Sequence, residues 1–440
     1  MTQVDTPTSV KLLLITYYWP PSGGMAVQRW LKMSGHLADM GVEVYVLTLD
    51  PKSAHYPTID SSLEFAVNPK VQVSHVRAFN PFVLAKQLLG SKVPQTGFSS
   101  EAHSSLWLKA VTFIRSHLFI PDPRKTWNRN AVNAAKKIID EQGIEIVVTT
   151  SPPQSVHLIG LALQKVRSIR WIADFRDPWT DIFYYKKLQH SVLSRFLDKR
   201  MELAVLRSAN AVVAVTPGFK KLLSEKVLPA ERDKFTVVTN GYDGDEVEQR
   251  HAEKGVVFRF MYSGTLIESY HIEAFFESIR RLSDDFPSIE IQIAGAISNP
   301  YQQQLEQRYP FIIFEGMMAH EAVLAAQKTA NALLLVGPDG TEYNGVVPGK
   351  LYEYLRTGVP IVYIGAEDSD VAQILQTCFA GETFERVGQE AEMDAFNVSL
   401  LKRYTEGAKE SSHNWTEVRK FKRRYVAEEF LRVMESLLKR

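Results

Sequence analysis

Short apolar runs alternate along the chain with longer stretches whose apolar residues recur at helical spacing. Residues 10–16, VKLLLIT, form an apolar run that predicts a buried parallel strand. Residues 27–41 place apolar side chains at intervals of three and four and end at a glycine, which predicts a helix. Residues 42–50, VEVYVLTLD, predict the next strand. This strand–helix–strand order is the unit from which parallel sheets are built.

The same alternation continues in two series, which are separated by a polar stretch at residues 241–255. The first series predicts further strands at 71–78, 144–150, 170–175, 210–216 and 234–240, and helices at 129–141, 154–167 and 191–208. The second series predicts strands at 256–264, 289–295, 311–316, 331–337 and 360–365, with a helix at 271–283. We therefore expect an α/β protein with two Rossmann-like parallel-sheet domains, at residues 1–245 and 246–413.

The last segment, residues 414–440, predicts a C-terminal helix. Asn414 and Glu417 have the spacing of a capping box, in which two side chains satisfy backbone groups at a helix start. Apolar residues then recur at helical spacing: Val418, Phe421, Tyr425, Phe430, Met434 and Leu437. Because such an apolar stripe must be covered, we expect this helix to pack back on the N-terminal domain.

Composition and charge narrow the classes of protein to consider. A chain of 440 residues with 45% hydrophobic and 23% charged residues is typical of a globular protein. Its formal net charge of +1 gives no reason to expect a nucleic-acid partner. The single cysteine, Cys378, excludes an internal disulfide framework and favours a reducing compartment. The first apolar run is too short for a signal peptide or a membrane span, so we expect a cytoplasmic protein.

In open parallel sheets, ligands bind outside the carboxyl ends of the strands, so the loops that follow strands are the candidate sites. Gly23 and Gly24 lie in such a loop, just before the first helix, where glycines let a phosphate approach backbone N–H groups. The alternative is a flexible strand-to-helix turn. The loop lacks the Gly-x-Gly-x-x-Gly pattern of nicotinamide-binding proteins. The eleven histidines are dispersed, so we expect no metal site.

Residues 174–179, DFRDPW, concentrate charge directly after a predicted strand. A carboxylate at this position, Asp174 or Asp177, can hold a sugar hydroxyl or accept its proton, and Arg176 lies between the two. The alternative is an internal pair of aspartate and arginine that fixes the loop. Ser151 follows the preceding predicted strand and is a further candidate for lining the same cleft.

Residues 345–354, GVVPGKLYEY, place a lysine in the first turn of a predicted helix. A helix N-terminus carries partial positive charge, so Lys350 is unfavourable there unless an anion binds. A diphosphate would gain the lysine charge and the free N–H groups together. Glu353, one turn later, is an acceptor for a ribose diol. The alternative is an exposed Lys350–Glu353 pair, which contributes about 0.2–0.5 kcal/mol.

Together these segments resemble a bacterial glycosyltransferase of the GT-B architecture, most like glycosyltransferase family 4. The resemblance rests on an ordered set of motifs over nearly the whole chain: YYWPPSGGMAVQR, TTSPPQSVHLIGL, DFRDPW, VVAVTPGF, TNGYDGDE, MYSGTL and PGKLYEYLRTGVPIV. It implies two Rossmann-like domains that face a cleft, with the acceptor on the N-terminal domain and a nucleotide-sugar donor on the C-terminal domain. It further implies retaining transfer of a hexosyl or related group to a glycan or lipid-linked acceptor in polysaccharide biosynthesis, with no cofactor and no metal.

The resemblance also implies roles for individual residues. Gly23 and Gly24 would approach the donor phosphates or sugar from the first domain, and Asp177 would lie near the reacting sugar. Gly264 would lie in the loop of the donor domain. Glu353 matches the second glutamate of the family's paired motif, which holds the nucleotide ribose.

The sequence departs from the family pattern in two places. Gly345 stands where the first glutamate of the pair is expected, and residues 263–273, SGTLIESYHIE, offer only His271 where the family has Arg and Lys. We therefore expect diphosphate binding to depend on Lys350 and backbone amides. Two other functions stay open: a nucleotide-sugar epimerase or phosphorylase of the same fold, and an inactive GT-B scaffold that binds a nucleotide sugar or a partner.

One further segment suggests a membrane contact. Residues 103–120, HSSLWLKAVTFIRSHLFI, are amphipathic and are followed by Arg124 and Lys125. A basic amphipathic helix can lie on a membrane surface, which would place the protein peripherally at the inner face of the membrane. The alternative is a packed helix of the first domain.

Overall fold

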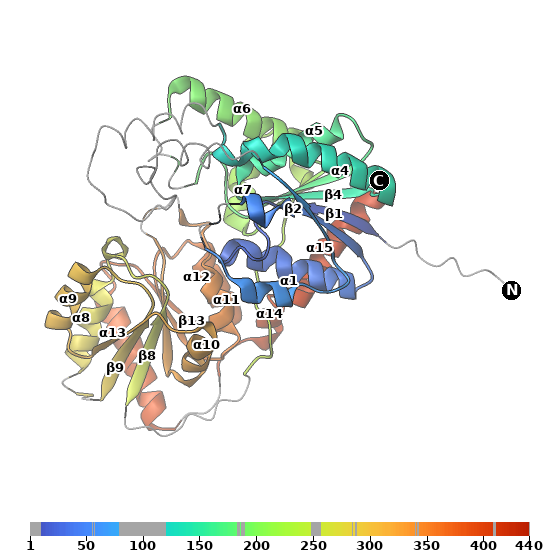
Figure 1. Ribbon diagram of the computed structural model, residues 1–440. Coiled ribbons are helices and arrows are strands. Elements are labelled where there is room, and N and C mark those ends of the chain that lie inside the picture. Colours follow the sequence, from blue (N-terminus) through green and yellow to red (C-terminus); the bar gives the residue numbers. More distant parts are fainter. Residues whose placement is uncertain are drawn as a thin grey trace. The chain divides into compact units, whose positions relative to one another are not determined.

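The computed structural model describes most of the chain, namely residues 10–54, 56, 58–78, 120–182, 185, 190–247, 257–283, 285–286, 288–338, 340, 343–407 and 411–439. The chain divides into two compact units (Figure 1). Unit 1 comprises Met1–Thr239 and Arg423–Arg440, and unit 2 comprises Asn240–Lys422. Each unit is built on its own parallel sheet, which confirms the predicted class of two Rossmann-like α/β units.

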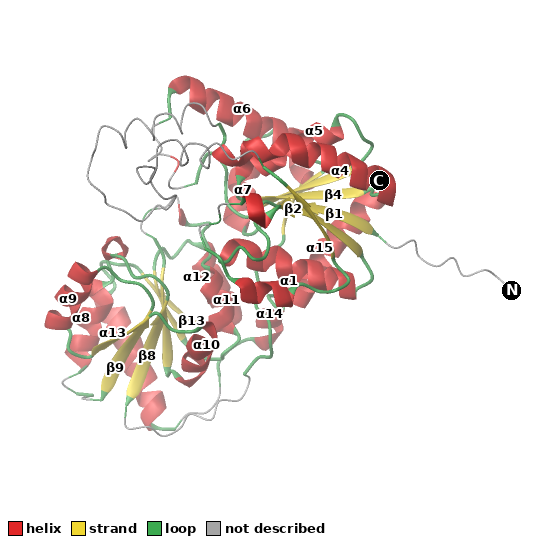
Figure 2. Cartoon of the chain, viewed as in Figure 1, coloured by secondary structure: helices red, strands yellow, loops and turns green. Residues whose placement is uncertain are grey.

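The sheet of unit 1, drawn in yellow with β1, β2 and β4 labelled in Figure 2, has the strand order β3-β2-β1-β4-β5-β6-β7. All its neighbouring strands are parallel. Its strands are β1 (Lys11–Ile15), β2 (Glu43–Leu49), β3 (Gln72–Val76), β4 (Ile146–Ser151), β5 (Arg170–Phe175), β6 (Ala211–Ala214) and β7 (Phe235–Val237). The order reverses between β1 and β4. In a doubly wound sheet this point is the usual place for a ligand.

Helices cover both faces of this sheet. They are α1 (Met25–Asp39), α4 (Asn128–Gln142), α5 (His157–Gln164), α6 (Val192–Ser208), α7 (Pro217–Ser224) and α15 (Arg423–Leu438). Leu12 and Leu14 of β1 belong to the apolar core under α1 and α15, whereas α4 and α5 pack on the other face (Figure 1). Trp30 of α1 meets Phe430 of α15 edge to face, with ring centroids 4.9 Å apart. The C-terminal helix is thus part of the core of unit 1.

The sheet of unit 2 has the order β10-β9-β8-β11-β12-β13 and is also parallel throughout. Its strands are β8 (Phe258–Ser263), β9 (Ile289–Ala294), β10 (Ile312–Gly316), β11 (Ala332–Val336), β12 (Ile361–Ile364) and β13 (Gly381–Phe384). Its helices are α8 (Glu273–Leu282), α9 (Asn299–Arg308), α10 (His320–Thr329), α11 (Gly349–Leu355), α12 (Asp370–Cys378), α13 (Glu390–Thr405) and α14 (Trp415–Arg419). One core joins the sheet to α8, α9 and α13, and a second joins it to α11, α12 and α14. The strand order of unit 2 reverses between β8 and β11.

Strands β1 to β12 all occur where apolar runs predicted strands, whereas β13 was not predicted. The β13 sequence, GETF, buries only Phe384 fully, so it carries no apolar run for sequence reasoning to find. The predicted helix at 154–167 begins as a 3-10 turn, Gln154–Val156, and continues as α5.

The C-terminal segment is two helices, α14 and α15, where the sequence predicted one. Asn414 makes no side-chain capping bond at the start of α14. Between the two helices, Lys422 forms an isolated β-bridge with Tyr242. This bridge belongs to unit 2 and the helix that follows belongs to unit 1, so residues 414–422 and 423–440 serve different cores. Among the helices of the described residues, none is long and apolar enough to cross a membrane.

Candidate functional site

Two strand edges are the natural candidates for ligand binding, one in each unit. In unit 1 the carboxyl ends of β1, β4 and β5 bring Gly23, Gly24, Ser151 and the DFRDPW segment to the same edge of the sheet. In unit 2 the carboxyl end of β8 lies at the point where the strand order reverses, and α11 follows β11 there. These are the positions at which open parallel sheets bind ligands.

The glycines before α1 form a tight, partly exposed turn. Gly24 is the N-cap of α1 and has a φ of 89°, a conformation that favours glycine. The N–H of Gly23 donates to the carbonyl of Thr58 at 2.9 Å. A Cβ at Gly23 would lie 3.2 Å from side-chain atoms of Thr58 and Asp60. The backbone of this turn is therefore set by the fold, and Gly24 is the position left exposed to solvent.

Asp174 is fully buried at the end of β5 and has several donors around it. Its Oδ1 accepts from Arg29 Nη2 at 2.9 Å, and its Oδ2 accepts from Trp30 Nε1 at 2.7 Å and Thr150 Oγ1 at 2.8 Å. Burial acts to raise the pKa of Asp174, but the charge and hydrogen bonds of Arg29, with those of Trp30 and Thr150, outweigh it, and the pKa is lowered. An internal Asp–Arg pair does exist here, but Arg29 of α1 is its arginine. Asp174 therefore has a structural role, since it links the end of β5 to α1.

Asp177, by contrast, is accessible. About 36% of its side chain is exposed, and Arg176 Nη2 lies 3.7 Å from its Oδ2. The side chain of Arg176 is 16% exposed. Asp177 is therefore the carboxylate of the DFRDPW segment that a ligand can reach, with a cation beside it.

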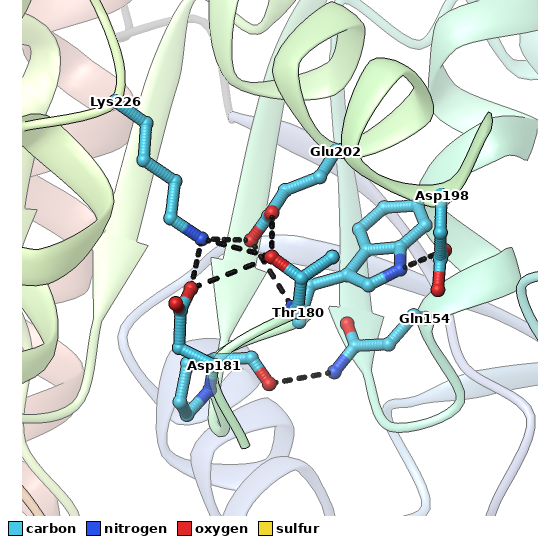
Figure 3. Close-up of polar contacts among 8 residues, drawn as sticks. Gln154, Thr180, Asp181, Asp198, Glu202 and Lys226 are labelled. Carbon is cyan, nitrogen blue, oxygen red and sulfur yellow. Dashed lines mark hydrogen bonds and ion pairs between the residues drawn. The ribbon is translucent and has the colours of Figure 1, made fainter. Parts of the chain in front are cut away.

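The loop that carries Asp177 is tied to α6 by two buried carboxylates (Figure 3). Trp179 Nε1 donates to Asp198 Oδ1 at 2.6 Å, and Thr180 Oγ1 donates to Glu202 Oε2 at 2.7 Å. Asp198 and Glu202 are one helical turn apart, so they hold consecutive residues of the loop. Sequence reasoning missed this pair because nothing in α6 itself shows which face is buried.

A lysine balances only one of these two carboxylates. Lys226 Nζ donates to Glu202 Oε1 at 2.7 Å and also bonds to Asp181. Asp198 has no such partner in the part of the chain that the structure describes, and burial raises its pKa to about 6. Asp198 is therefore a buried acid whose charged form is poorly compensated.

Ser151 and His157 flank the end of β4. Ser151 is buried, and its Oγ has no hydrogen-bond partner among the described residues. His157 is also buried, with Nδ1 2.9 Å from Thr149 Oγ1 and its ring stacked on Phe175. Burial lowers the pKa of His157 to about 3, so the ring is neutral at physiological pH. His157 is a packed core residue, whereas Ser151 keeps an unused hydroxyl.

In unit 2, Lys350 lies at the start of α11 and points to the end of β8. Its Nζ donates to the carbonyl of Ser263 at 2.8 Å and lies 3.9 Å from the ring centroid of Tyr262. Gly264, with a φ of 124°, is so close that a Cβ there would lie 3.0 Å from Nζ. Burial lowers the pKa of Lys350 to about 7. The structure thus brings together Lys350 and Gly264, two of the predicted donor-binding residues.

Glu353 is half-buried on α11, and the alternative of an exposed Lys350–Glu353 pair is not formed. Gly345, at the position of the missing glutamate, is buried in the turn before the helix. Lys350 therefore has hydrogen-bonding and ring contacts but no carboxylate partner within the described ranges.

Arg386 is a cation at this edge that sequence reasoning missed. It follows β13, and its guanidinium donates to the carbonyls of Tyr270, at 2.9 Å, and Gly337. It thus joins the loops after β8 and β11. His271, the cation noted in the sequence, is exposed and has a φ of 49°. The position of Arg386 depends on β13, the strand that carried no apolar signal.

The described residues contain no cluster of three or more His, Cys, Asp or Glu side chains that could hold a metal ion. The amphipathic segment at 103–120 lies outside the described residues except for its last residue, so its two alternatives remain as predicted.

Comparisons with known proteins identify the family and the fold of the chain. The family model for Glycosyltransferase Family 4 matches residues 23–246, slightly more than half of the chain. A search of curated proteins found no match.

Solved structures show the same fold. Sucrose-phosphate synthase from Thermosynechococcus elongatus is 13% identical, with 98% of this chain and 99% of that chain covered and a TM-score of 0.61. The lipopolysaccharide outer core galactosyltransferase WaaB is 13% identical, with 97% and 99% covered and a TM-score of 0.58. Anabaena Alr3699/HepE in complex with UDP-glucose is 11% identical, with 97% and 99% covered and a TM-score of 0.60. These likenesses show the GT-B fold.

Proposed function

The chain belongs to glycosyltransferase family 4, and from this membership we propose that it transfers a hexosyl or related group from a nucleotide sugar to a glycan or lipid-linked acceptor. We further propose that configuration is retained and that the product is a bacterial surface polysaccharide or its precursor. The observation that carries the proposal is the family match to residues 23–246. Lys350, a lysine without a carboxylate partner among the described residues, supports it from the side of the donor.

Unit 2 is the proposed donor site. A diphosphate beside Lys350 would supply the opposite charge that this buried ammonium lacks, and would raise its pKa again. Gly264 lets the Lys350 ammonium approach the backbone at the end of β8, because a Cβ there would lie 3.0 Å from Nζ. Glu353 is proposed to accept from the ribose hydroxyls. Because HepE was solved with UDP-glucose, a UDP-sugar is the first donor class to test.

Unit 1 is the proposed acceptor side. Asp177, accessible and beside Arg176, would hold the acceptor hydroxyl, while Ser151 offers a free Oγ at the neighbouring strand end. Gly23 and Gly24 would approach the donor phosphates or sugar from the same edge. As the glycosidic bond breaks, Lys350 and backbone N–H groups would stabilise the diphosphate charge, and the leaving phosphate or Asp177 would take the acceptor proton. The proposal needs no metal and no cofactor.

The test is a screen of UDP-, GDP- and ADP-sugars for thermal stabilisation, followed by measurement of nucleotide release with candidate acceptors. Lys350→Ala and Glu353→Ala should each weaken nucleotide binding and transfer at least about tenfold, the effect expected for loss of one charged contact. Lys402→Ala, an exposed lysine on α13 of the same unit, is the matched control and should behave as the wild type. Transfer at the wild-type rate by both site variants would contradict the assignment.

The same screen separates the other two functions. Turnover of the sugar nucleotide without an acceptor, or release of a sugar phosphate, would indicate an epimerase or phosphorylase. Gly345 in place of the first glutamate favours the scaffold as the second candidate. A scaffold that binds nucleotide sugar would show thermal stabilisation without turnover, and one that binds only a partner would show neither.

A further inference from the structure

The first half of helix α6 has the opposite polarity to that of an ordinary surface helix. Its carboxylates Asp198 and Glu202 are 1% and 2% exposed, because they bind the loop after β5 (Figure 3). The large apolar side chains near its start are instead on the outside: Val192 is 76% exposed, Leu193 66% and Phe196 58%, whereas Val205 and Leu206 near its end are buried. A surface helix normally buries its apolar residues and exposes its charges.

The remaining charges on the exposed side of α6 are all positive. We define the outer face of α6 as its exposed residues in the first half of the helix: Val192, Leu193, Arg195, Phe196, Leu197, Lys199 and Arg200. No side-chain hydrogen bond or ion pair of its three cations occurs in the part of the chain that the structure describes. Because both acids point inward, the outer face combines apolar side chains and unneutralised cations without a single carboxylate.

Helix α4 of the same unit shows that the fold does not require a helix to expose its apolar side chains. It buries Ala131, Ala135 and Ile139 against the sheet and exposes polar residues such as Lys137. Both helices belong to the layers of unit 1, but only α6 exposes a row of large apolar side chains. Val192, Phe196 and Arg200 follow each other at intervals of four, so they lie along one line of the helix.

An open recess adjoins the outer face. It has a volume of about 540 Å³ and is lined by Ile120, Lys125, Leu161, Leu197, Arg200, Met201 and Ala204. Leu197 and Arg200 therefore belong to both the recess and the outer face. The recess continues the same chemistry, an apolar floor with cations.

We propose that the outer face of α6 is a docking surface for a bilayer that contains anionic lipid. Apolar side chains would enter the headgroup region while Arg195, Lys199 and Arg200 reach lipid phosphates with their charged ends. The absence of any carboxylate on this face is the complementarity that a negative membrane surface requires. The inference deepens the lipid-linked acceptor part of the proposed function, and it concerns α6 independently of the contact predicted for residues 103–120.

The test is flotation of the full chain with phosphatidylcholine vesicles, with and without phosphatidylglycerol. We expect the wild type to float only with the anionic vesicles. Phe196→Glu should lower the partition coefficient at least about tenfold, through lost apolar insertion and a new like charge. Lys199→Gln and Arg200→Gln should each lower it about fivefold. Phe65→Glu is the matched control, because Phe65 is 94% exposed elsewhere in unit 1, and it should float as the wild type does.

Three results would overturn the proposal. The wild type could fail to float with anionic vesicles, Phe196→Glu could float as well as the wild type, or Phe65→Glu could lose binding equally. If flotation fails and Phe196→Glu abolishes a concentration-dependent dimer, the face binds a second copy of the chain. If flotation fails and Phe196→Glu lowers the melting temperature, the face is covered within the chain. Flotation needs no sugar donor, so its failure is distinct from failure of the transferase assignment.

Discussion

Asp174 in unit 1 and Lys350 in unit 2 both lie at the carboxyl edge of their sheets, but among the described residues an opposite charge lies beside Asp174 and not beside Lys350. Arg29 and two neutral donors hold the Asp174 carboxylate, so its pKa is lowered despite complete burial. Among the described residues Lys350 contacts a carbonyl and an aromatic ring but no carboxylate, and burial lowers its pKa to about 7. Removal of one partner from a compensated buried pair is strongly destabilising. A poorly compensated charge instead favours the binding of a ligand of opposite charge. This difference distinguishes the sheet edge of unit 2 from that of unit 1.

The largest expected effect tests the first half of this comparison. Asp174→Asn keeps the size of the side chain but removes the carboxylate charge that lies beside the buried Arg29 guanidinium. We expect it to lower the free energy of unfolding by about 3–5 kcal/mol. Urea unfolding followed by tryptophan fluorescence measures this, because Trp30 and Trp171 lie in the core of unit 1.

Asp140→Asn is the matched control for Asp174→Asn. Asp140 forms a two-bond pair with Arg167 at 2.8 Å, but on the surface of unit 1. Water screens such a pair, so we expect little change in stability. If the two variants were equally stable, Asp174 would not be the anchor that its contacts indicate.

The next effect concerns Asp198, a buried acid in unit 1 with a raised pKa. Between its ordinary value of 3.8 and about 6, the folded protein holds the Asp198 proton more tightly than the unfolded chain does. Stability therefore falls as pH rises through this window. Asp198→Asn stays neutral and should be more stable than the wild type by about 3 kcal/mol above the window, with no difference below it.

Urea unfolding of Asp198→Asn and the wild type at a series of pH values would measure this difference. The asparagine keeps an oxygen that can accept from Trp179, so the hydrogen bond to the loop is retained. A difference independent of pH would show that Asp198 is not the titrating group. Such a result would also mean that Asp198, unlike Lys350, is not a poorly compensated buried charge.

The smallest expected effect concerns Lys350, the poorly compensated charge of the comparison, and it rests on the proposed donor site. Free Lys350 loses its proton near pH 7, and a diphosphate binds the charged form. The affinity for UDP should therefore fall above that pH by up to about tenfold per pH unit, until the pKa of the complex is reached. Calorimetric titration with UDP at a series of pH values from below 7 upwards measures this affinity. Lys350→Met should bind more weakly and lack this pH dependence, whereas an unchanged pH dependence in Lys350→Met would assign it to another group.

The sequence predicted the strands well because most of them, such as β1, β2, β4 and β11, are buried apolar runs, a local signal that needs no knowledge of the rest of the fold. The same local reasoning located Lys350, since a lysine in the first turn of a helix conflicts with the helix dipole. It did not show what Lys350 contacts, because Ser263 and Tyr262 are far away along the chain.

Pairings over long sequence separations account for the rest. Arg29 and Asp174 meet across 145 residues, so the sequence offered Arg176 as the more obvious partner. Arg386 became visible only with β13, whose polar sequence gave no strand signal. The inward carboxylates of α6 could not be predicted either, because their partners lie in a loop and in the segment after α7.

The place of α15 in the core of unit 1 has a consequence for the order of folding during synthesis. Unit 2 is continuous in sequence, so it can fold as soon as Lys422 has left the ribosome. Unit 1 cannot complete its core until Phe430 and Met434 have been translated, after the whole of unit 2. During that interval the α1 face, with Trp30, stays uncovered and is the surface that a chaperone would be expected to protect.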